Sequence, residues 1–257
     1  MTELSWLGMG LIYIILIIPI ILNRILGLKI SRNLLQTVIH MSLQLILIGY
    51  YLEVLFRLNN VWLNIGWLLV MMLIANITTL KRAHLGIARM LPGQFIAIGI
   101  SFLTVLFYFL LVALRLSPWY DAAYLVTIGG MLLGGIMRDN VVALERFYSA
   151  LQQRNREFMA MQLLGATPKE ACKPFFVESM QAALMPHLAN MATVGIVSLP
   201  GMMTGQMISG GSPLTAIRYQ VAIMVTMFVT MELSSFLSIK FSIRKAFDER
   251  GNLKTDL

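Results

Sequence analysis

Residues 92–114 read PGQFIAIGISFLTVLFYFLLVAL, an apolar run of 23 residues without a charged side chain. A helix of about 20 apolar residues spans the hydrocarbon core of a bilayer, which is about 30 Å thick. This run is therefore long enough to cross a membrane. Dividing the rest of the chain at charged and turn-forming residues gives six further predicted spans: Leu4–Leu22, Leu34–Phe56, Val61–Leu80, Tyr120–Met137, His187–Ile208 and Leu214–Ile239.

The composition of the whole chain supports a membrane protein. Its 257 residues are 58% hydrophobic and 12% charged, against the roughly 25% charged residues of soluble domains. So few charged side chains cannot cover a surface in water, which excludes soluble and disordered classes. The single cysteine, Cys172, excludes an internal disulfide and a cysteine-based metal cluster. We predict an all-α, polytopic integral membrane protein with about seven transmembrane helices in one domain, residues 1–257.

The basic residues predict how these spans are oriented. The segments before, between and after the seven spans hold 0, 3, 1, 3, 1, 6, 1 and 5 lysines and arginines. Cytoplasmic loops carry the excess of basic residues, so we expect the N-terminus outside, the C-terminus in the cytoplasm and 17 of the 20 basic residues inside. The net charge of +8 then reflects topology rather than nucleic-acid binding. The N-terminal run lacks the basic start of a cleavable signal peptide and is expected to remain as the first span.

The longest polar stretch, at about 138–186, falls between the fifth and sixth spans. Its apolar residues follow helical spacing, so the fifth span is expected to continue into the cytoplasm as an amphipathic helix that ends at Gly165. Thr167-Pro168-Lys169-Glu170 then has the form of a capping box with proline at the first helical position. Pro174 is expected to kink this second helix. Such a turned pair suits insertion into a partner's groove, whereas the alternative is a plain loop between spans.

Several stretches of this sequence resemble the FetB-type permeases of ATP-binding cassette (ABC) transporters. The most specific are QLLGATPKEA at 162–171 and VSLPGMMTG at 197–205, and QLILIGY at 44–50 and AIRYQ at 216–220 fit as well. The resemblance covers nearly the whole chain. That family is described as the membrane half of an iron-export system, and it includes plant membrane subunits tied to aluminium tolerance.

The resemblance implies a transporter that works with other subunits in the cell membrane. The chain has no Gly-Lys pair and so no phosphate-binding loop. ATP and Mg²⁺ are therefore expected on a separate nucleotide-binding subunit, with no cofactor and no catalytic residue on this chain. The family's organisation implies two permease copies with two ATPases. The residues expected to couple to the ATPase are Leu164, Gly165, Ala166, Thr167, Pro168 and Glu170.

The fifth span departs from the family pattern at one position. GMLLG at 130–134 is followed by Gly135, where the family usually has asparagine. If that asparagine contacts substrate, the handling of substrate is expected to differ in this chain. The glycine pairs 129–130 and 134–135 also form a small-residue face suited to close helix packing, either in a dimer or within the chain.

Polar residues inside the spans are candidates for a translocation pathway. Glu232 is the only carboxylate well inside a span, where a charge costs about 2.5–3.5 kcal/mol and usually faces a cavity or a partner. Pro200-Gly201 should loosen the sixth span and act as a gate. The alternatives are polar bonds between helices and a static kink. The candidates are His40, Gln44, Asn76, Ser198, Pro200, Gly201, Met202, Met203, Gln206, Gln220 and Glu232, with Met224, Met227, Met231 and Ser235 forming a stripe beside Glu232.

The sequence permits more than one cargo and more than one class of transporter. No dense set of metal ligands occurs in the sequence, so transient contact of a metal ion with His40 and Glu232 is favoured over chelation. The 19 methionines permit a copper(I) site, above all at Met202 and Met203, although methionine is also a common packing residue. The alternative function is a stand-alone seven-helix carrier or channel without an ATPase.

Overall fold

The computed structural model describes residues 5–247 of the chain, so Leu4 and the basic residues Arg250 and Lys254 lie outside it. Within the described residues the chain is mainly helical, and one β-bridge joins Val194 to Ser198. The chain divides into two compact units, an N-terminal unit of residues 1–58 and a main unit of residues 59–257. Each unit is described by itself.

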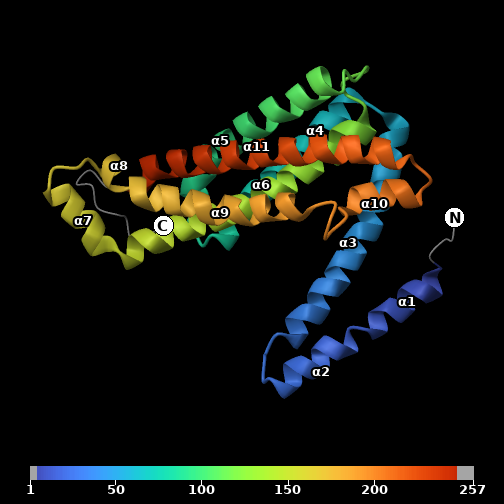
Figure 1. The fold of residues 1–257 in the computed structure, drawn as a ribbon, viewed down its shortest axis with the longest axis horizontal. Helices are drawn as coiled ribbons and strands as arrows, with labels where there is room; N and C mark the ends of the chain where they lie inside the picture. Colours follow the sequence, from blue (N-terminus) through green and yellow to red (C-terminus); the bar gives the residue numbers. More distant parts are fainter. Residues whose placement is uncertain (1–4, 248–257) are drawn as a thin grey trace. The chain divides into compact units, whose positions relative to one another are not determined.

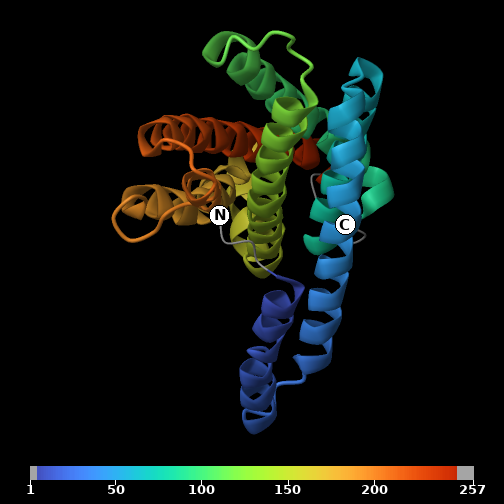
Figure 2. The same ribbon diagram turned by 90° about the vertical axis from the view of Figure 1, so that its right-hand side faces the viewer.

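The N-terminal unit is a helical hairpin. Its first arm contains α1 (Trp6–Ile14) and α2 (Ile17–Ile25), and its second arm is α3 (Ser31–Leu58), which runs back alongside α2 (Figures 1 and 2). The first arm is interrupted before α2 because Pro19 has no N–H to bond the carbonyl of Ile15. Most side chains of the hairpin are apolar and exposed, which suits a lipid environment rather than water.

The main unit is built around three long helices, α5 (Ile87–Phe107), α6 (Ala122–Gln153) and α11 (Pro213–Ala246), which all contact one another. Helices α4 (Val61–Arg82) and α9 (Lys173–Thr193) pack against α6, and a short π-helix, Tyr108–Ala113, continues α5. The buried side chains form two clusters. One contains Phe102, Leu125 and Ile136, and the other contains Phe147, Phe158 and Phe175.

Six helical segments of the described chain are long and apolar enough to cross a membrane: Leu7–Ile25, Ser31–Leu58, Val61–Arg82, Ile87–Ala113, Ala122–Gln153 and Pro213–Ile243. They correspond to the predicted first to fifth and seventh spans, so the prediction of an all-α polytopic membrane protein is confirmed. Helix α6 is 32 residues long and continues past Met137, the predicted end of the fifth span. The prediction that this helix runs on to Gly165 is wrong, because α6 ends at Gln153 and a separate helix, Asn155–Leu163, follows it.

The predicted sixth span, His187–Ile208, is not one helix, and its break begins earlier than the predicted loosening at Pro200-Gly201. Helix α9 ends at Thr193, and α10 (Gly201–Ile208) begins only after a connection of seven residues, 194–200. Gly195 has a φ of +88°, a conformation that ends helices, and Pro200 has no N–H with which to continue one. Pro200 is therefore the N-cap of α10, at the end of a full break rather than at a kink.

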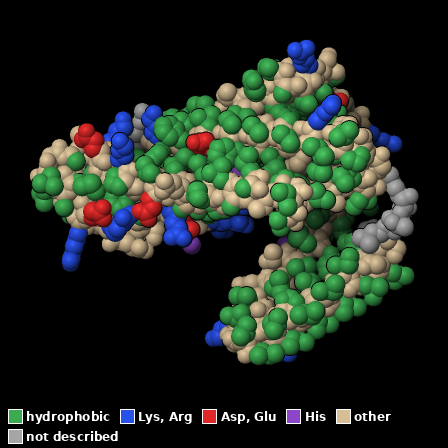
Figure 3. Space-filling view, viewed as in Figure 1, with side chains coloured by type: hydrophobic (Ala, Val, Ile, Leu, Met, Phe, Trp, Pro, Cys, Tyr) green, Lys and Arg blue, Asp and Glu red, His purple; other side chains and the backbone are tan. Residues whose placement is uncertain are grey.

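Charged and apolar side chains separate along the main unit. Figure 1 places α7 (Asn155–Leu163) and α8 (Pro168–Ala171) at one end of this unit and α10 at the other. The face in Figure 3 shows lysine, arginine and acidic side chains gathered at the end with α7 and α8, whereas apolar side chains cover the helices toward its middle. The α7–α8 end is thus the polar end of a largely apolar unit.

Candidate functional site

The turn between α7 and α8 has the capped geometry that its sequence predicts. The chain leaves α7 at Gly165, whose φ is +96°, and the N–H of Ala166 donates to the carbonyl of Met161 at 3.0 Å. The hydroxyl of Thr167 accepts from the N–H of Glu170 at 3.3 Å, and the Glu170 carboxylate accepts from the N–H of Thr167 at 2.9 Å. These Thr167 contacts lower the pKa of Glu170, so the carboxylate stays charged. The predicted capping box is confirmed.

The predicted kink at Pro174 is instead a break between two helices. Helix α8 ends at Ala171 and α9 begins at Lys173, with Pro174 in its first turn. Proline fits there because the N–H that it lacks would have no helical partner. Behind the break, the guanidinium of Arg154 hydrogen-bonds Glu178 and lies 4.7 Å from the ring centroid of Phe175. The α7–α8 segment is thereby fixed to α6 and α9.

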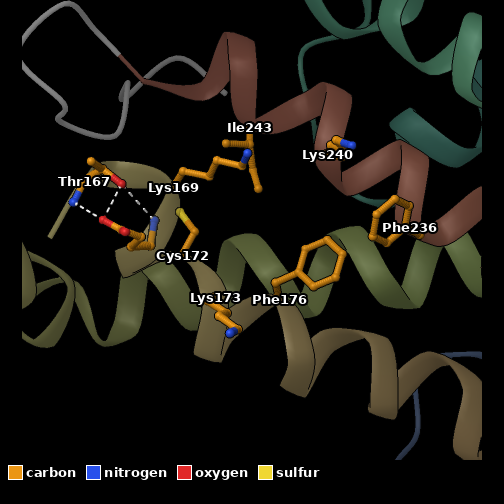
Figure 4. A pocket seen from close by; sticks show the side chains of 9 residues that line it. Thr167, Lys169, Cys172, Lys173, Phe176, Phe236, Lys240 and Ile243 are labelled. Carbon is orange, nitrogen blue, oxygen red and sulfur yellow. Dashed lines mark hydrogen bonds between the residues drawn. The ribbon is translucent and has the colours of Figure 1, made fainter.

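A groove of about 510 Å³ runs from the capped turn to α11 (Figure 4). Thr167, Cys172 and Phe176 line one side, and Phe236 and Ile243 of α11 line the other, with three lysines at its rim. Burial raises the pKa of the Cys172 thiol to about 12. The aromatic rings of Phe176 and Phe236 meet edge to face at 5.6 Å. Helix α9, which follows the capped turn, is therefore packed against α11 beside the groove.

A second cavity, of about 550 Å³, lies farther along α11, between α4, α6, α10 and α11. We call it the pathway cavity, because it brings together four predicted pathway residues, Pro200, Gly201, Met202 and Gln220. Gln220 is only 8% exposed, and its Oε1 has no hydrogen-bond partner among the described residues. The remaining lining includes Arg82, Arg138, Met131, Met137 and Met227.

Glu232 does not line the pathway cavity. It is exposed, whereas Gln220, Met224, Met231 and Ser235 are buried, so Glu232 flanks this stripe at the edge of the exposed face of α11. The reason is helical phase, because residue 232 falls in register with the exposed Val225, Val229 and Phe236. Glu232 lines a shallower hollow of about 340 Å³ with Met180 and Leu233.

The other predicted pathway residues are distributed over both units. His40 and Gln44 are exposed on α3 of the N-terminal unit. Asn76 is fully buried and donates to the carbonyl of Met72 at 2.8 Å, which is a bond within its own helix. Ser198 is exposed in the connection before α10, whereas Met203 and Gln206 face inward from α10, with Gln206 Oε1 unpartnered among the described residues.

A buried polar network joins α5, α6 and α11. The Asn140 amide donates to Ser234 at 2.9 Å and to Ser238 at 3.0 Å, and it accepts from Ser235 at 2.9 Å. Gln94 donates to Ser238 at 3.0 Å. Such satisfied networks fix helix register and are costly to break in a low-dielectric surrounding. Of this group, only Ser235 belongs to the polar stripe that the sequence predicts.

Sequence reasoning also missed the arginines of the pathway cavity. Arg82 and Arg138 were counted only as markers of topology, because both lie at the expected cytoplasmic ends of spans. The sequence contains a sign only for Arg138, which follows closely after the glycines of the fifth span. Nothing in the sequence indicates that Arg82, at the end of α4, lies near the start of α10. Among the described residues no group of three or more His, Cys, Asp or Glu side chains is placed to hold a metal ion.

Comparisons with known proteins agree with the resemblance seen in the motifs. A profile described as "Uncharacterised protein family (UPF0014)" matches residues 6–247. UPF0014 membrane protein slr1647 of Synechocystis is 35% identical over 98% of both chains. The probable iron export permease protein FetB of Escherichia coli is 29% identical over 96% of this chain and 93% of its own, and Protein ALUMINUM SENSITIVE 3 of Arabidopsis thaliana is 30% identical over 94% and 87%. No solved structure matches significantly.

Proposed function

Since this chain belongs to the UPF0014 family of membrane proteins, we propose that it is the permease subunit of an ABC transporter that exports iron or another metal ion. One relative is named a probable iron export permease, which supports this cargo and direction. In this proposal, the chain itself is not an enzyme. Two copies act in the cell membrane with two ATPase subunits, which bind ATP and Mg²⁺.

The observation that carries the proposal is that α11 joins the pathway cavity to the capped turn. Gln220 and Met227 of α11 line the cavity, and Phe236 and Ile243 of the same helix line the groove at the turn. From Met227 to Ile243 an unbroken helix rises about 24 Å. A displacement imposed on the turn would therefore move the cavity wall as a rigid element, which is what coupling to an ATPase requires.

The tip of the capped turn supports the same role. Leu163 and Leu164 are each 89% exposed, although the segment behind them is anchored through the buried Phe158. An exposed apolar pair on a rigid, capped turn is typical of a protein contact rather than of a solvated loop. We assign this tip to the ATPase groove, and with it the coupling residues Leu164 to Pro168 and Glu170.

The test is ATP turnover by the reconstituted complex. With the ATPase subunit co-expressed, the double substitution Leu163→Ser and Leu164→Ser should reduce co-purification of the ATPase and its cargo-stimulated turnover at least about tenfold, because the apolar contact is removed. Gln152→Ser is the matched control, since Gln152 is exposed on α6 but is not part of the tip. It should leave both measurements unchanged.

Two outcomes would contradict the proposal. If the purified chain moves cargo across a liposome membrane down its gradient at the same rate with and without ATPase and ATP, it is a stand-alone carrier or channel. If the tip variant keeps full turnover while the folded protein is present in normal amounts, the capped turn does not couple to the ATPase.

A further inference from the structure

We propose that the pathway cavity binds an oxyanion group, so that the cargo is an organic anion, or a metal ion carried in complex with one, rather than a bare cation. This inference rests on the proposed function only in treating the cavity as the route of the cargo. It is carried by three features of the cavity: its arginines, the start of α10 and Gln220.

The charge of the cavity lining is entirely positive. Arg82 and Arg138 line it, and no carboxylate is among its lining residues. Asp139 follows Arg138 on α6 but is not part of the lining, and neither arginine forms an ion pair among the described residues. Both arginines are exposed at the edge of the cavity, and Asp139 is the acidic neighbour of Arg138. Their guanidinium groups provide paired donors for phosphate or carboxylate oxygens and make the lining unfavourable for a bare metal cation.

The N-terminus of α10 opens into the same cavity. Pro200 and Gly201 line it, and no side chain caps the helix. The first helical hydrogen bond runs from the N–H of Thr204 to the carbonyl of Pro200, which leaves the N–H groups of the preceding turn without a helical partner. Such free N–H groups, together with the positive end of the helix dipole, favour an anion.

Gln220 is an independent sign of a missing ligand. It lines the cavity from α11, it is only 8% exposed, and its Oε1 has no partner among the described residues. A buried amide oxygen without a partner is costly. A hydroxyl or other donor on the ligand would satisfy it, which indicates a ligand that carries both acceptor oxygens and a donor.

The size of the cavity is that of a site for an organic ligand. A volume of about 550 Å³ falls within the range of sites that hold organic ligands, about 300–1,000 Å³. Met131, Met202 and Met227 give the remaining wall an apolar and adaptable surface. An organic oxyanion with a small apolar or metal-bearing part suits both the arginines and the methionine wall of the cavity.

The experiment uses the full-length protein in nanodiscs of neutral lipid, without an ATPase. Three probes are compared: radiolabelled citrate alone, ⁵⁵Fe³⁺ complexed with citrate, and ⁵⁵Fe²⁺ without a chelator. We expect at least one citrate-containing probe to bind and the unchelated ion not to bind. Preference for the iron complex over free citrate identifies a chelated metal as cargo, and the reverse identifies an organic anion.

Arg138→Gln should weaken binding of the citrate probe about tenfold to a hundredfold, because one charge-assisted contact is lost. Arg138→Lys should keep part of the affinity. Arg146→Gln is the matched control, as Arg146 is exposed on the same helix outside the cavity. The measurement is repeated in nanodiscs of phosphatidylglycerol. If this lipid removes citrate binding in the wild type but not in Arg138→Gln, the oxyanion that binds the cavity is a lipid headgroup.

Binding of unchelated Fe²⁺ that is insensitive to Arg138→Gln, or no binding of any oxyanion probe by protein that elutes as a folded species, overturns the inference. Neither outcome depends on an ATPase. Failure of ATP-dependent transport with intact citrate binding would overturn the proposed function alone.

Discussion

Neighbouring glycines on α6 face different surroundings. A Cβ added at Gly129 would lie 2.8 Å from Leu68 of α4, and one added at Gly135 would lie 3.1 Å from the sulfur of Met231 on α11. Gly134, by contrast, has nothing within 4 Å and lines the pathway cavity. Of the two uses that the sequence left open for this small-residue face, packing within the chain therefore accounts for Gly129 and Gly135.

Gly135 is the position where the resemblance implies asparagine, and we expect Gly135→Asn to lower stability by about 1–3 kcal/mol. The new side chain must displace Met231 and Met227, which lie 3.1 and 3.3 Å from the position of its Cβ. Thermal unfolding of the purified protein, followed by size-exclusion chromatography after heating, measures the effect. Adding Met231→Ala should recover part of the loss by opening space.

Gly134→Ala is the control for helix propensity, because it adds a methyl group to the same helix in open space. It should be neutral or slightly stabilising, since alanine favours a helix over glycine. An unfolding temperature for Gly135→Asn equal to that of the wild type would contradict this prediction, because it would show that Met227 and Met231 move aside without loss of stability.

At the scale of single residues, composition and spacing predicted the place of some polar residues in the fold but not that of others. Gln220 and Met202 were predicted for the pathway and do line the cavity, because hydrophobic phase along one helix is readable from sequence. Glu232 does not line this cavity, since a polar residue in a span gives no sign of which face its own helix buries. Asn140 escaped notice because its partners come from other helices.

At the scale of elements, local signals carried most of the prediction. The capping box at Thr167 and the positive φ of Gly165 depend only on nearby residues, and both follow from the sequence. The break between α9 and α10 does not, because proline rules predict a kink at Pro200, whereas the helix already ends at Thr193. The left-handed Gly195 and the β-branched residues around it were the overlooked signal.

We expect Thr167→Ala to reduce cargo-stimulated ATP turnover, because loss of the cap costs about 1 kcal/mol and loosens the start of α8. Hydrogen exchange should speed up at 167–171. The lowered pKa of Glu170 means that the cap is complete above the usual glutamate pKa and is lost as the pH falls through the lowered value. Thr167→Ser keeps the hydroxyl and serves as the control; equal exchange in both variants would contradict a role for the cap.

At the scale of the whole molecule, the alternating basic residues and the discontinuous α9–α10 pair both bear on how many times the chain crosses the membrane. Six continuous apolar helices would place both termini on the same side. The charge pattern predicts that they lie on opposite sides, which would require a seventh crossing. The α9–α10 pair can supply it, since broken helices cross membranes where their free backbone groups line a cavity, as Pro200 and Gly201 do.

This topology predicts that the capped turn faces the cytoplasm and the α10–α11 connection faces the exterior. In intact cells, a membrane-impermeant maleimide should label Ser209→Cys but not Leu164→Cys, and opening the membrane should reverse the protection of Leu164→Cys. Native Cys172 is a silent background, because it is buried and, with a pKa of about 12, has on the order of 1 thiolate in 100,000 molecules at neutral pH. Labelling of Leu164→Cys in intact cells would place the capped turn outside, where no ATPase could reach it.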